Sequence, residues 1–315
     1  MRVVGTLTTM PYRYVNNNKL LDTLKSLNNQ SYKLDKIYLG LPYRCERLNI
    51  DYPEVSEEIK NLCTIVRCED YGPITKIVAA LLMEEDSETI IISFDDDNYY
   101  PKFLVEKLIK KNGLYPNAAI GSSGILLKNL LPDCAIYLNN NMFNMFNFKI
   151  PKNGRRVDSI YGFSGVLYIR NFFPIKEKLY NDFIKYALTN ENIRMNDDIS
   201  ISGFLSMGNI ERRIFSDLDV ISPSTDGNKN DLSANSFNFI RKLNLSIITA
   251  KSIGMYKNTE EVYFSDTILY KIFIILFIIL FIIFLLYKNS YINNIYKQYI
   301  ISMDNYNCIY NYNII

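Results

Sequence analysis

The hydrophobic pattern around which the chain is organised is the apolar run Ile90–Ile92, which continues through Ser93 and Phe94 into three acidic residues, Asp95 to Asp97. A short apolar run rich in β-branched residues is typical of a strand buried on both faces of a parallel sheet. In open α/β sheets, ligands bind in the crevice outside the carboxyl ends of the strands. The pattern therefore predicts a central strand that ends in three carboxylates at a binding site.

Short apolar runs alternate with helical patterns through the first part of the chain. A helix is expected around Leu20–Leu27, where leucines recur on one face, and another at Thr75–Met83. The strands expected around these helices are Arg2–Thr8, Lys36–Leu41 and Cys63–Cys68. This alternation favours a three-layer α/β domain with a mostly parallel sheet.

The second half of the domain is less regular. The aromatic, Asn-rich segment Met142–Phe148 is expected to form a hairpin or a loop, and the polar stretch 222–235 a mobile loop. Further strands are expected at Ala118–Ser122, Ile125–Leu127, Val157–Tyr161 and Val166–Arg170. Further helices are expected at Pro174–Leu188, Asn196–Met207 and Phe237–Leu245.

One long apolar segment follows the domain. Residues 267–287 are apolar apart from Lys271, and a helix of this length crosses a hydrocarbon core of about 30 Å. The alternative, a buried core helix, would need a partner that is apolar on all sides. The segment predicts a single-pass membrane helix, with a domain over 1–250 and a linker over 251–266 before it and a tail over 288–315 after it.

The composition of the chain excludes several kinds of partner and catalytic site. The 315-residue chain is 48% apolar, carries a net charge of +2 and shows no basic stripe, so no nucleic-acid partner is expected. The absence of histidine excludes Ser-His-Asp and Cys-His catalysis as well as histidine-ligated zinc. No two of the five cysteines are spaced as a C-x-x-C pair, which favours reduced thiols over a disulfide framework or a zinc site. Proton transfer must then fall to carboxylates, lysine, tyrosine or cysteine.

The acidic triplet is the strongest candidate for a metal site. Asp95 and Asp97 are two residues apart, so on an extended chain they face the same way while Asp96 faces the other. Paired oxygen ligands at the end of a strand suit Mg²⁺ or Mn²⁺ shared with a phosphate. The alternative is a solvated turn in which an aspartate caps the helix after Pro101.

Four segments occur in an order that resembles the GT-A glycosyltransferases, especially the family 2-like enzymes, over roughly residues 1–245. They are RCEDYGPITKIVAAL, FDDDNYYP, YGFSGVLYIR and NDDISISGFL. The resemblance implies the Rossmann-like GT-A fold. FDDDNYYP is similar to the DxD motif of the family, which implies Asp95 and Asp97 as metal ligands and Asp96 as a donor-binding residue.

The other segments imply further roles. In the family's strand, loop and helix before DxD, a glycine and a basic residue approach the nucleotide diphosphate, which implies Gly72 and Lys76. YGFSGVLYIR resembles the acceptor-side segment. NDDISISGFL resembles the acidic motif that supplies the catalytic base, which implies Asp198 as the base and Asp197 as a helix cap or acceptor-binding residue. The alternatives are a solvated helix residue for Lys76 and simple N-capping for the acidic pair.

The chain departs from the family after the second strand, where many members hold the nucleobase with an Asp-rich turn. Leu39–Pro42 stands there instead. Base recognition is therefore expected from the first loop, in particular from Thr8, Pro11 and Tyr12. The usual Glu-Asp of the base motif is Asp-Asp in this chain, and no downstream histidine can add a metal ligand.

The expected function is transfer of a sugar, with inversion, from a nucleotide-diphosphate sugar to a hydroxyl of a carbohydrate, lipid or protein. A UDP-sugar is the expected donor and Mn²⁺ or Mg²⁺ the expected cofactor. No charged-then-apolar leader precedes the first strand, so the catalytic domain is expected on the cytosolic side of the membrane. The alternatives are a nucleotidyltransferase of related fold and a non-catalytic, membrane-anchored nucleotide-sugar-binding domain.

Overall fold

The computed structural model describes one compact part of the chain. The described residues are 1–15, 19–127, 135–138, 154–218 and 236–256. They all belong to a unit that runs from Met1 to Thr259. The segment Met142–Phe148, expected to form a hairpin or a loop, and the expected loop 222–235 lie outside the described residues.

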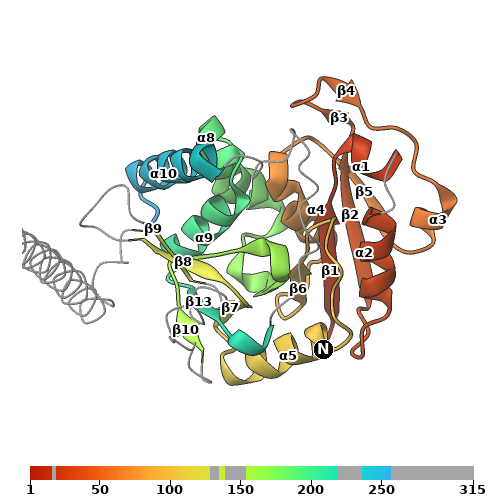
Figure 1. Cartoon of the computed structure of the whole chain (residues 1–315), viewed down its shortest axis with the longest axis horizontal. Helices are drawn as coiled ribbons and strands as arrows, with labels where there is room; N and C mark the ends of the chain where they lie inside the picture. The colour runs from red at the N-terminus through yellow and green to blue at the C-terminus, as the bar shows by residue number, and fades with distance from the viewer. Residues whose placement is uncertain (16–18, 128–134, 139–153, 219–235, 257–315) are drawn as a thin grey trace, which may run out of the picture. The chain divides into compact units, whose positions relative to one another are not determined.

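A mixed eight-stranded sheet forms the centre of the described domain (Figure 1). Its strands are β1 (Val3–Thr8), β2 (Lys36–Pro42), β5 (Thr64–Cys68), β6 (Ile90–Ser93), β7 (Ala118–Gly121), β10 (Arg155–Arg156), β12 (Val166–Ile169) and β13 (Glu211–Ile214). Their order is β10-β13-β7-β12-β6-β1-β2-β5, and β12 runs antiparallel to both neighbours. The predicted α/β class with a mostly parallel sheet is confirmed.

The helices and smaller elements surround this sheet. The helices are α1 (Pro11–Val15), α2 (Lys19–Asn28), α3 (Glu57–Lys60), α4 (Thr75–Met83), α5 (Leu104–Leu114), α7 (Lys185–Ala187), α8 (Glu191–Arg194), α9 (Asp197–Met207) and α10 (Ser236–Ser252). A second sheet contains β11 (Ser159–Ile160), β8 (Gly124–Leu127) and β9 (Ala135–Leu138), and a hairpin contains β3 (Arg44–Cys45) and β4 (Ile50–Asp51).

Helices cover both faces of the main sheet. Thr6 of β1 donates a hydrogen bond to a main-chain carbonyl of α4, so α4 covers the face to which Thr6 points. Successive side chains of a strand point to opposite faces, and an added Cβ at the neighbouring Gly5 would lie 3.2 Å from the Phe94 ring. An added Cβ at Gly165 would lie 3.2 Å from the same ring and 3.4 Å from Leu104, so α5 lies on this second face. The expected three layers are therefore present.

The register of β6 aligns the parts of the site. Ser93, its last residue, lies opposite Thr6 of the parallel strand β1 and opposite Val166 of the antiparallel strand β12. Parallel strands end at the same edge of a sheet, and an antiparallel neighbour begins there. The loop after β1, the acidic triplet after β6 and the turn before β12 therefore meet at one edge.

A buried aromatic ring lies beneath this edge. Phe94 is fully buried and packs edge to face against Tyr100, with ring centroids 4.7 Å apart. Gly5 and Gly165 approach the Phe94 ring so closely that side chains there would require it to shift. Gly165 also has φ of +87°, a conformation that glycine adopts without strain. The floor of the acidic loop is thus held by close packing.

The single helix expected over Pro174–Leu188 is wrong. The segment instead contains a 3₁₀ turn (Lys176–Lys178), a π-helical turn (Tyr180–Ile184) and the short helix α7. Proline disfavours helical backbone in the residue before it, and Phe173 is extended, with φ −119° and ψ 155°. The π-helical turn places Phe183 in the core, with its ring centroid 4.8 Å from that of Phe204.

The C-terminal part of the described chain packs into the domain. Met255 and Tyr256, within the range expected to be a linker, are buried, and the Tyr256 hydroxyl donates to the Ile199 carbonyl at 2.8 Å. Among the described residues, no helix has the length and apolar character needed to span a membrane. The expected span 267–287 and the tail 288–315 lie outside them.

Candidate active site

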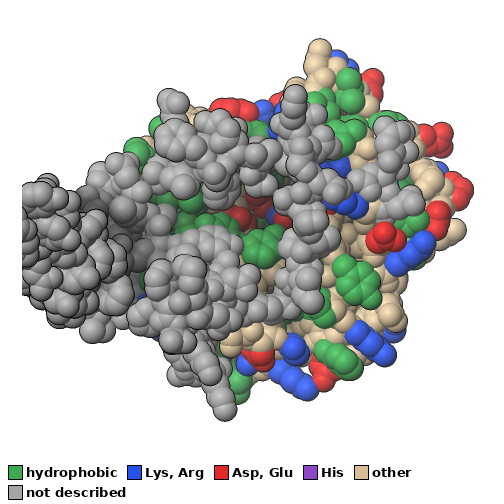
Figure 2. Space-filling view, viewed as in Figure 1, with side chains coloured by type: hydrophobic (Ala, Val, Ile, Leu, Met, Phe, Trp, Pro, Cys, Tyr) green, Lys and Arg blue, Asp and Glu red, His purple; other side chains and the backbone are tan. Residues whose placement is uncertain are grey.

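The acidic triplet lies at the end of β6, on the edge where β1 also ends. The side chains of Asp95 and Asp97 are 32% and 30% exposed, whereas that of Asp96 is 6% exposed. This difference fits the predicted alternation of directions. The alternative in which an aspartate caps the following helix is wrong, because α5 begins after Phe103 without a side-chain cap. Figure 2 shows a few acidic side chains near the middle of the face that is in view.

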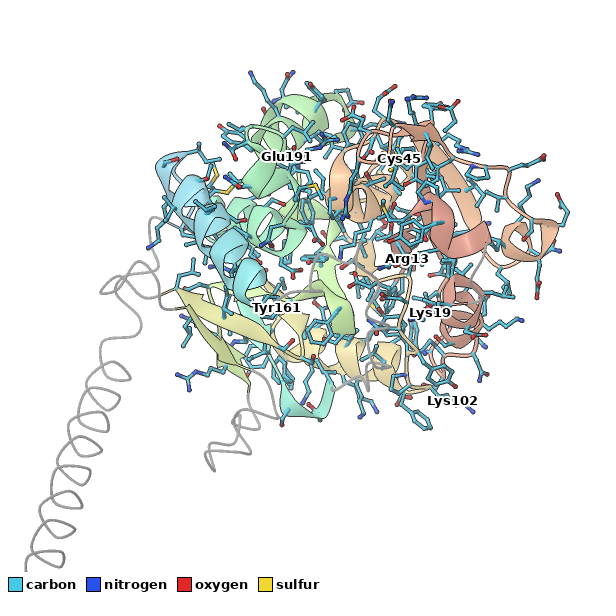
Figure 3. The ribbon with its side chains drawn as sticks, turned by 45° about the horizontal axis from the view of Figure 1, so that its top comes forward. Arg13, Lys19, Cys45, Lys102, Tyr161 and Glu191 are labelled. Carbon is cyan, nitrogen blue, oxygen red and sulfur yellow. The ribbon has the colours of Figure 1, made fainter. Side chains whose placement is uncertain are left out.

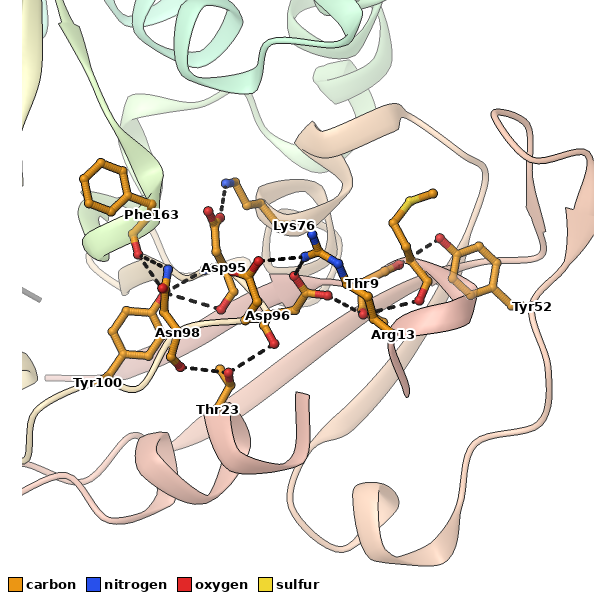
Figure 4. A network of polar contacts seen from close by, with 12 residues as sticks. Thr9, Arg13, Thr23, Tyr52, Lys76, Asp95, Asp96, Asn98, Tyr100 and Phe163 are labelled. Carbon is orange, nitrogen blue, oxygen red and sulfur yellow. Dashed lines mark hydrogen bonds and ion pairs between the residues drawn. The ribbon is translucent and has the colours of Figure 1, made fainter. Parts of the chain in front are cut away.

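Asp96 anchors the loop from inside. Its carboxylate accepts a hydrogen bond from the Thr9 hydroxyl and forms an ion pair with Arg13 (Figure 4). Its carbonyl accepts from the Thr23 hydroxyl of α2 at 3.1 Å. Burial raises the pKa of Asp96, and the Arg13 guanidinium opposes that rise. In the described structure, the Asp96 side chain is therefore buried and held by Thr9 and Arg13, whereas those of Asp95 and Asp97 are partly exposed.

Arg13 is a residue of this site that the sequence reasoning missed. It lies on α1 (labelled in Figure 3), and Nη1, which contacts Asp96, is also 3.2 Å from Oδ2 of Asp97. One guanidinium thus contacts two adjacent carboxylates. Arg13 directly follows Pro11 and Tyr12 in the loop expected to hold the nucleobase, so its place in the sequence was the available signal.

Lys76 joins the triplet to the acidic pair on α9. Its ammonium lies 2.7 Å from Oδ1 of Asp95 and 2.5 Å from Oδ2 of Asp197. The Lys76 side chain is only 7% exposed, so the alternative of a solvated helix residue is wrong. Burial lowers the pKa of Lys76, but the negative charges of Asp197 and Asp95 outweigh it, and the pKa lies well above its ordinary value.

The acidic pair begins helix α9. The N-cap is Asn196, whose side chain accepts from the Ile199 N–H at 3.2 Å, so the capping role suggested for Asp197 is wrong. Asp198 turns toward the Gly162 turn and accepts its N–H through Oδ1 at 2.8 Å. Burial, and then the charge of Asp197, raise the pKa of Asp198 well above its ordinary value. The two carboxylates of the pair therefore have different partners.

A short hydrogen-bond network joins the triplet to the turn before β12. The Tyr100 hydroxyl accepts from the Asp95 N–H at 2.8 Å and lies 3.0 Å from the Phe163 carbonyl, to which it can donate. The Asn98 amide donates to the same carbonyl at 2.8 Å (Figure 4). Gly162, the residue before Phe163, binds Asp198. The main chain of this turn thus connects the two acidic segments.

The remaining predicted donor residues have local roles in the described structure. Gly72 has φ of +68°, donates its N–H to the Asp70 carboxylate at 2.7 Å and leaves no room for a side chain beside Arg194. The Thr8 hydroxyl donates to the Gly40 carbonyl at 2.8 Å. Pro11 is buried and Tyr12 half-buried at the start of α1. Thr9, rather than Thr8, contacts the acidic triplet.

The partly exposed carboxylates of Asp95 and Asp97 suit a divalent cation whose remaining ligands come from a bound substrate. Asp95 and Asp97 offer oxygen ligands, and Mg²⁺ is usually held by one or two carboxylates together with phosphates and water. Within the described ranges, no group of three or more acidic, histidine or cysteine residues could hold a metal on its own. Both carboxylates also contact a cationic side chain, Lys76 or Arg13. The two aspartates could therefore hold a divalent cation only together with further ligands, such as the oxygens of a phosphate.

Comparison with known proteins adds no assignment. No family model matches the chain, and no curated protein sequence matches it significantly. The function is therefore argued from the residues of the acidic site and their geometry.

Proposed function

We propose that the chain is a metal-dependent GT-A glycosyltransferase. It transfers a sugar, with inversion, from a nucleotide-diphosphate sugar to a hydroxyl group. The observation that carries the proposal is that Lys76 contacts both Asp95 and Asp197. Two acidic segments far apart in the sequence thus line one site, which is the arrangement that donor activation and proton removal require together.

The exposed carboxylates define the donor side. A dication held by Asp95 and Asp97 would neutralise the diphosphate that leaves when the sugar is transferred. Arg13 holds the acidic loop of the donor side in place, because it forms ion pairs with Asp96 and Asp97. We propose that the nucleotide lies along the edge formed by Thr8, Pro11 and Tyr12, with a UDP-sugar as donor. Gly72 remains a proposed donor-side residue through the turn before α4.

The acidic pair defines the acceptor side. An acceptor hydroxyl has a pKa far above neutrality, so a positioned carboxylate must take its proton as the new bond forms. Asp198 suits this role by its position, because its carboxylate lies 2.8 Å from the Gly162 N–H, in the turn that Tyr100 joins to the acidic triplet, and a general base must lie within reach of the proton that it removes. Asp197 is held by Lys76 and serves to position that ammonium. The acceptor class stays open among carbohydrate, lipid and protein hydroxyls.

The proposal extends to the membrane. The apolar segment 267–287 would anchor the chain as a single-pass protein, with the catalytic domain on the cytosolic side, where nucleotide-sugars are made. Protease treatment of sealed vesicles tests this topology. Protection of the N-terminal domain would contradict the orientation, and recovery of full-length protein in the soluble fraction would contradict the anchor.

The catalytic proposal is tested with full-length protein and a panel of nucleotide-sugars. Release of nucleoside diphosphate is measured with Mn²⁺, with Mg²⁺ and with excess chelator, and Asp97→Ala serves as the inactive comparison. We expect release that needs the cation and is lost in Asp97→Ala. Full activity in chelator would contradict the metal role. Formation of nucleoside triphosphate and sugar 1-phosphate when pyrophosphate is added would instead indicate a nucleotidyltransferase, and binding without turnover a non-catalytic domain.

A further inference from the structure

We infer that Lys76 is the resident cation of the acidic site and competes with the divalent cation for Asp95. The inference deepens the proposed function and rests on it for the choice of Asp95 as a metal ligand. This competition makes the affinity for the metal depend on the diphosphate, because the metal alone must displace the Lys76 ammonium from Asp95.

The position of Lys76 is fixed by its surroundings. It is the second residue of α4, and its carbonyl accepts a hydrogen bond from Thr6 of the central sheet. Its ammonium is so close to the Gly162 turn that an added Cβ at Gly162 would lie 2.9 Å from Nζ. Lys110 on the surface of α5, in contrast, has a side chain that is 70% exposed. Lys76 is therefore held in the site by packing as well as by charge.

The charges around Lys76 explain why it occupies Asp95. Its ammonium lies 2.7 Å from Oδ1 of Asp95 and 2.5 Å from Oδ2 of Asp197, so a single ammonium balances two carboxylates. A dication bound to Asp95 would lie close to this ammonium, and two positive charges at that range repel each other. A diphosphate bound to the same dication adds negative charge, which offsets the repulsion between the dication and the Lys76 ammonium. Lys76 can release Asp95 without losing its charge partner, because Asp197 remains at 2.5 Å.

A different role for Lys76 leads to a different result. If Lys76 only binds the donor phosphate, its removal weakens nucleotide binding and leaves the affinity for free metal unchanged. If it competes with the metal, its removal strengthens the binding of metal alone. The direction of the change in metal affinity therefore separates the two roles, and no donor needs to be known.

The test is titration of full-length protein with Mn²⁺ alone, with free Mn²⁺ measured by electron paramagnetic resonance. In Lys76→Met we expect the dissociation constant to fall at least about tenfold, since a like charge beside the ligand is removed. The matched control is Lys111→Met, because Lys111 is also little exposed and paired with an aspartate, Asp217, at 3.1 Å. It should bind Mn²⁺ as the wild type does. Adding Asp95→Asn to Lys76→Met should abolish the gain.

Two further variants cover the case in which Lys76→Met does not fold. Lys76→Gln keeps a hydrogen-bond donor near the carboxylates and should show the same gain. Asp197→Asn keeps the lysine but removes the charge of its ion-pair partner Asp197, so Lys76 should hold Asp95 more tightly and Mn²⁺ should bind more weakly than in the wild type. Unchanged Mn²⁺ affinity in the Lys76 variants, or tighter binding in Asp197→Asn, would overturn the inference. Absence of sugar transfer with these metal results intact would refute only the proposed function.

Discussion

Tyr100 offers a direct test of how the site is held together. Tyr100→Phe removes the hydroxyl and keeps the ring, which packs on Phe94 with centroids 4.7 Å apart. The Phe163 carbonyl keeps the Asn98 amide as a donor at 2.8 Å, whereas the Asp95 N–H loses the acceptor that it had at 2.8 Å. A buried donor left without a partner costs about 1–3 kcal/mol, and the Asp95 N–H is partly buried. We expect the free energy of unfolding to fall by that amount.

The assay is urea unfolding of full-length protein followed by circular dichroism, with Tyr99→Phe as the control. Tyr99 is the adjacent residue, is 60% exposed and loses the same hydroxyl in the control variant. Its free energy of unfolding should change by no more than about 0.5 kcal/mol, as is usual for exposed positions. Equal stability of the two variants would refute the view that the Tyr100 hydroxyl joins the acidic loop to the Gly162 turn.

Three further predictions follow from the same contacts. Asp198→Asn should slow sugar transfer by roughly 10²–10⁴-fold with little change in donor binding, because only the proton acceptor is removed; the measurement is transfer rate against donor affinity. Asn196→Ala should lower the free energy of unfolding by about 1 kcal/mol in urea titration, because it removes the N-cap of α9. Asp158→Asn should change the pH dependence of stability, because burial raises the pKa of Asp158 to about 6. The folded domain then binds this proton more tightly than the unfolded chain, so stability is lost as pH rises from about 4 to about 6, by up to about 3 kcal/mol. Melting temperatures at pH 4.5 and 7.5 should show the variant gaining on the wild type at the higher pH.

Each of these predictions has a result that would count against it. A wild-type transfer rate in Asp198→Asn, with Asp197→Asn inactive, would move the base by one residue. An unchanged unfolding midpoint in Asn196→Ala would show that water or a neighbour satisfies the end of α9. A constant difference in melting temperature between Asp158→Asn and the wild type across the pH range would show that Asp158 titrates normally.

Local pattern was sufficient for the central strands and for α4. The apolar runs of β1, β2 and β6 lie within a residue or two of their predicted bounds, and Thr75–Met83 was predicted as observed. The strands are buried on both faces and α4 is buried over most of its surface. Their runs of apolar residues can therefore be recognised from the sequence alone. Strand β13 was missed because Glu211, Arg212 and Arg213 are charged. It pairs in parallel with β7, and no pattern within residues 211–214 indicates pairing with a strand far away in the sequence.

The sequence by itself determined the residue types of the site and their order: an acidic triplet at the end of a buried strand, a lysine before it and an acidic pair after it. The tertiary structure decided which of these charged side chains form ion pairs with each other. Arg13 contacts Asp96 and Asp97, and Lys76 contacts Asp95 and Asp197, only because the loops after β1 and β6 and the turn before β12 share one edge of the sheet. Such pairings follow from strand register between distant segments, and that register depends on the packing of the whole domain.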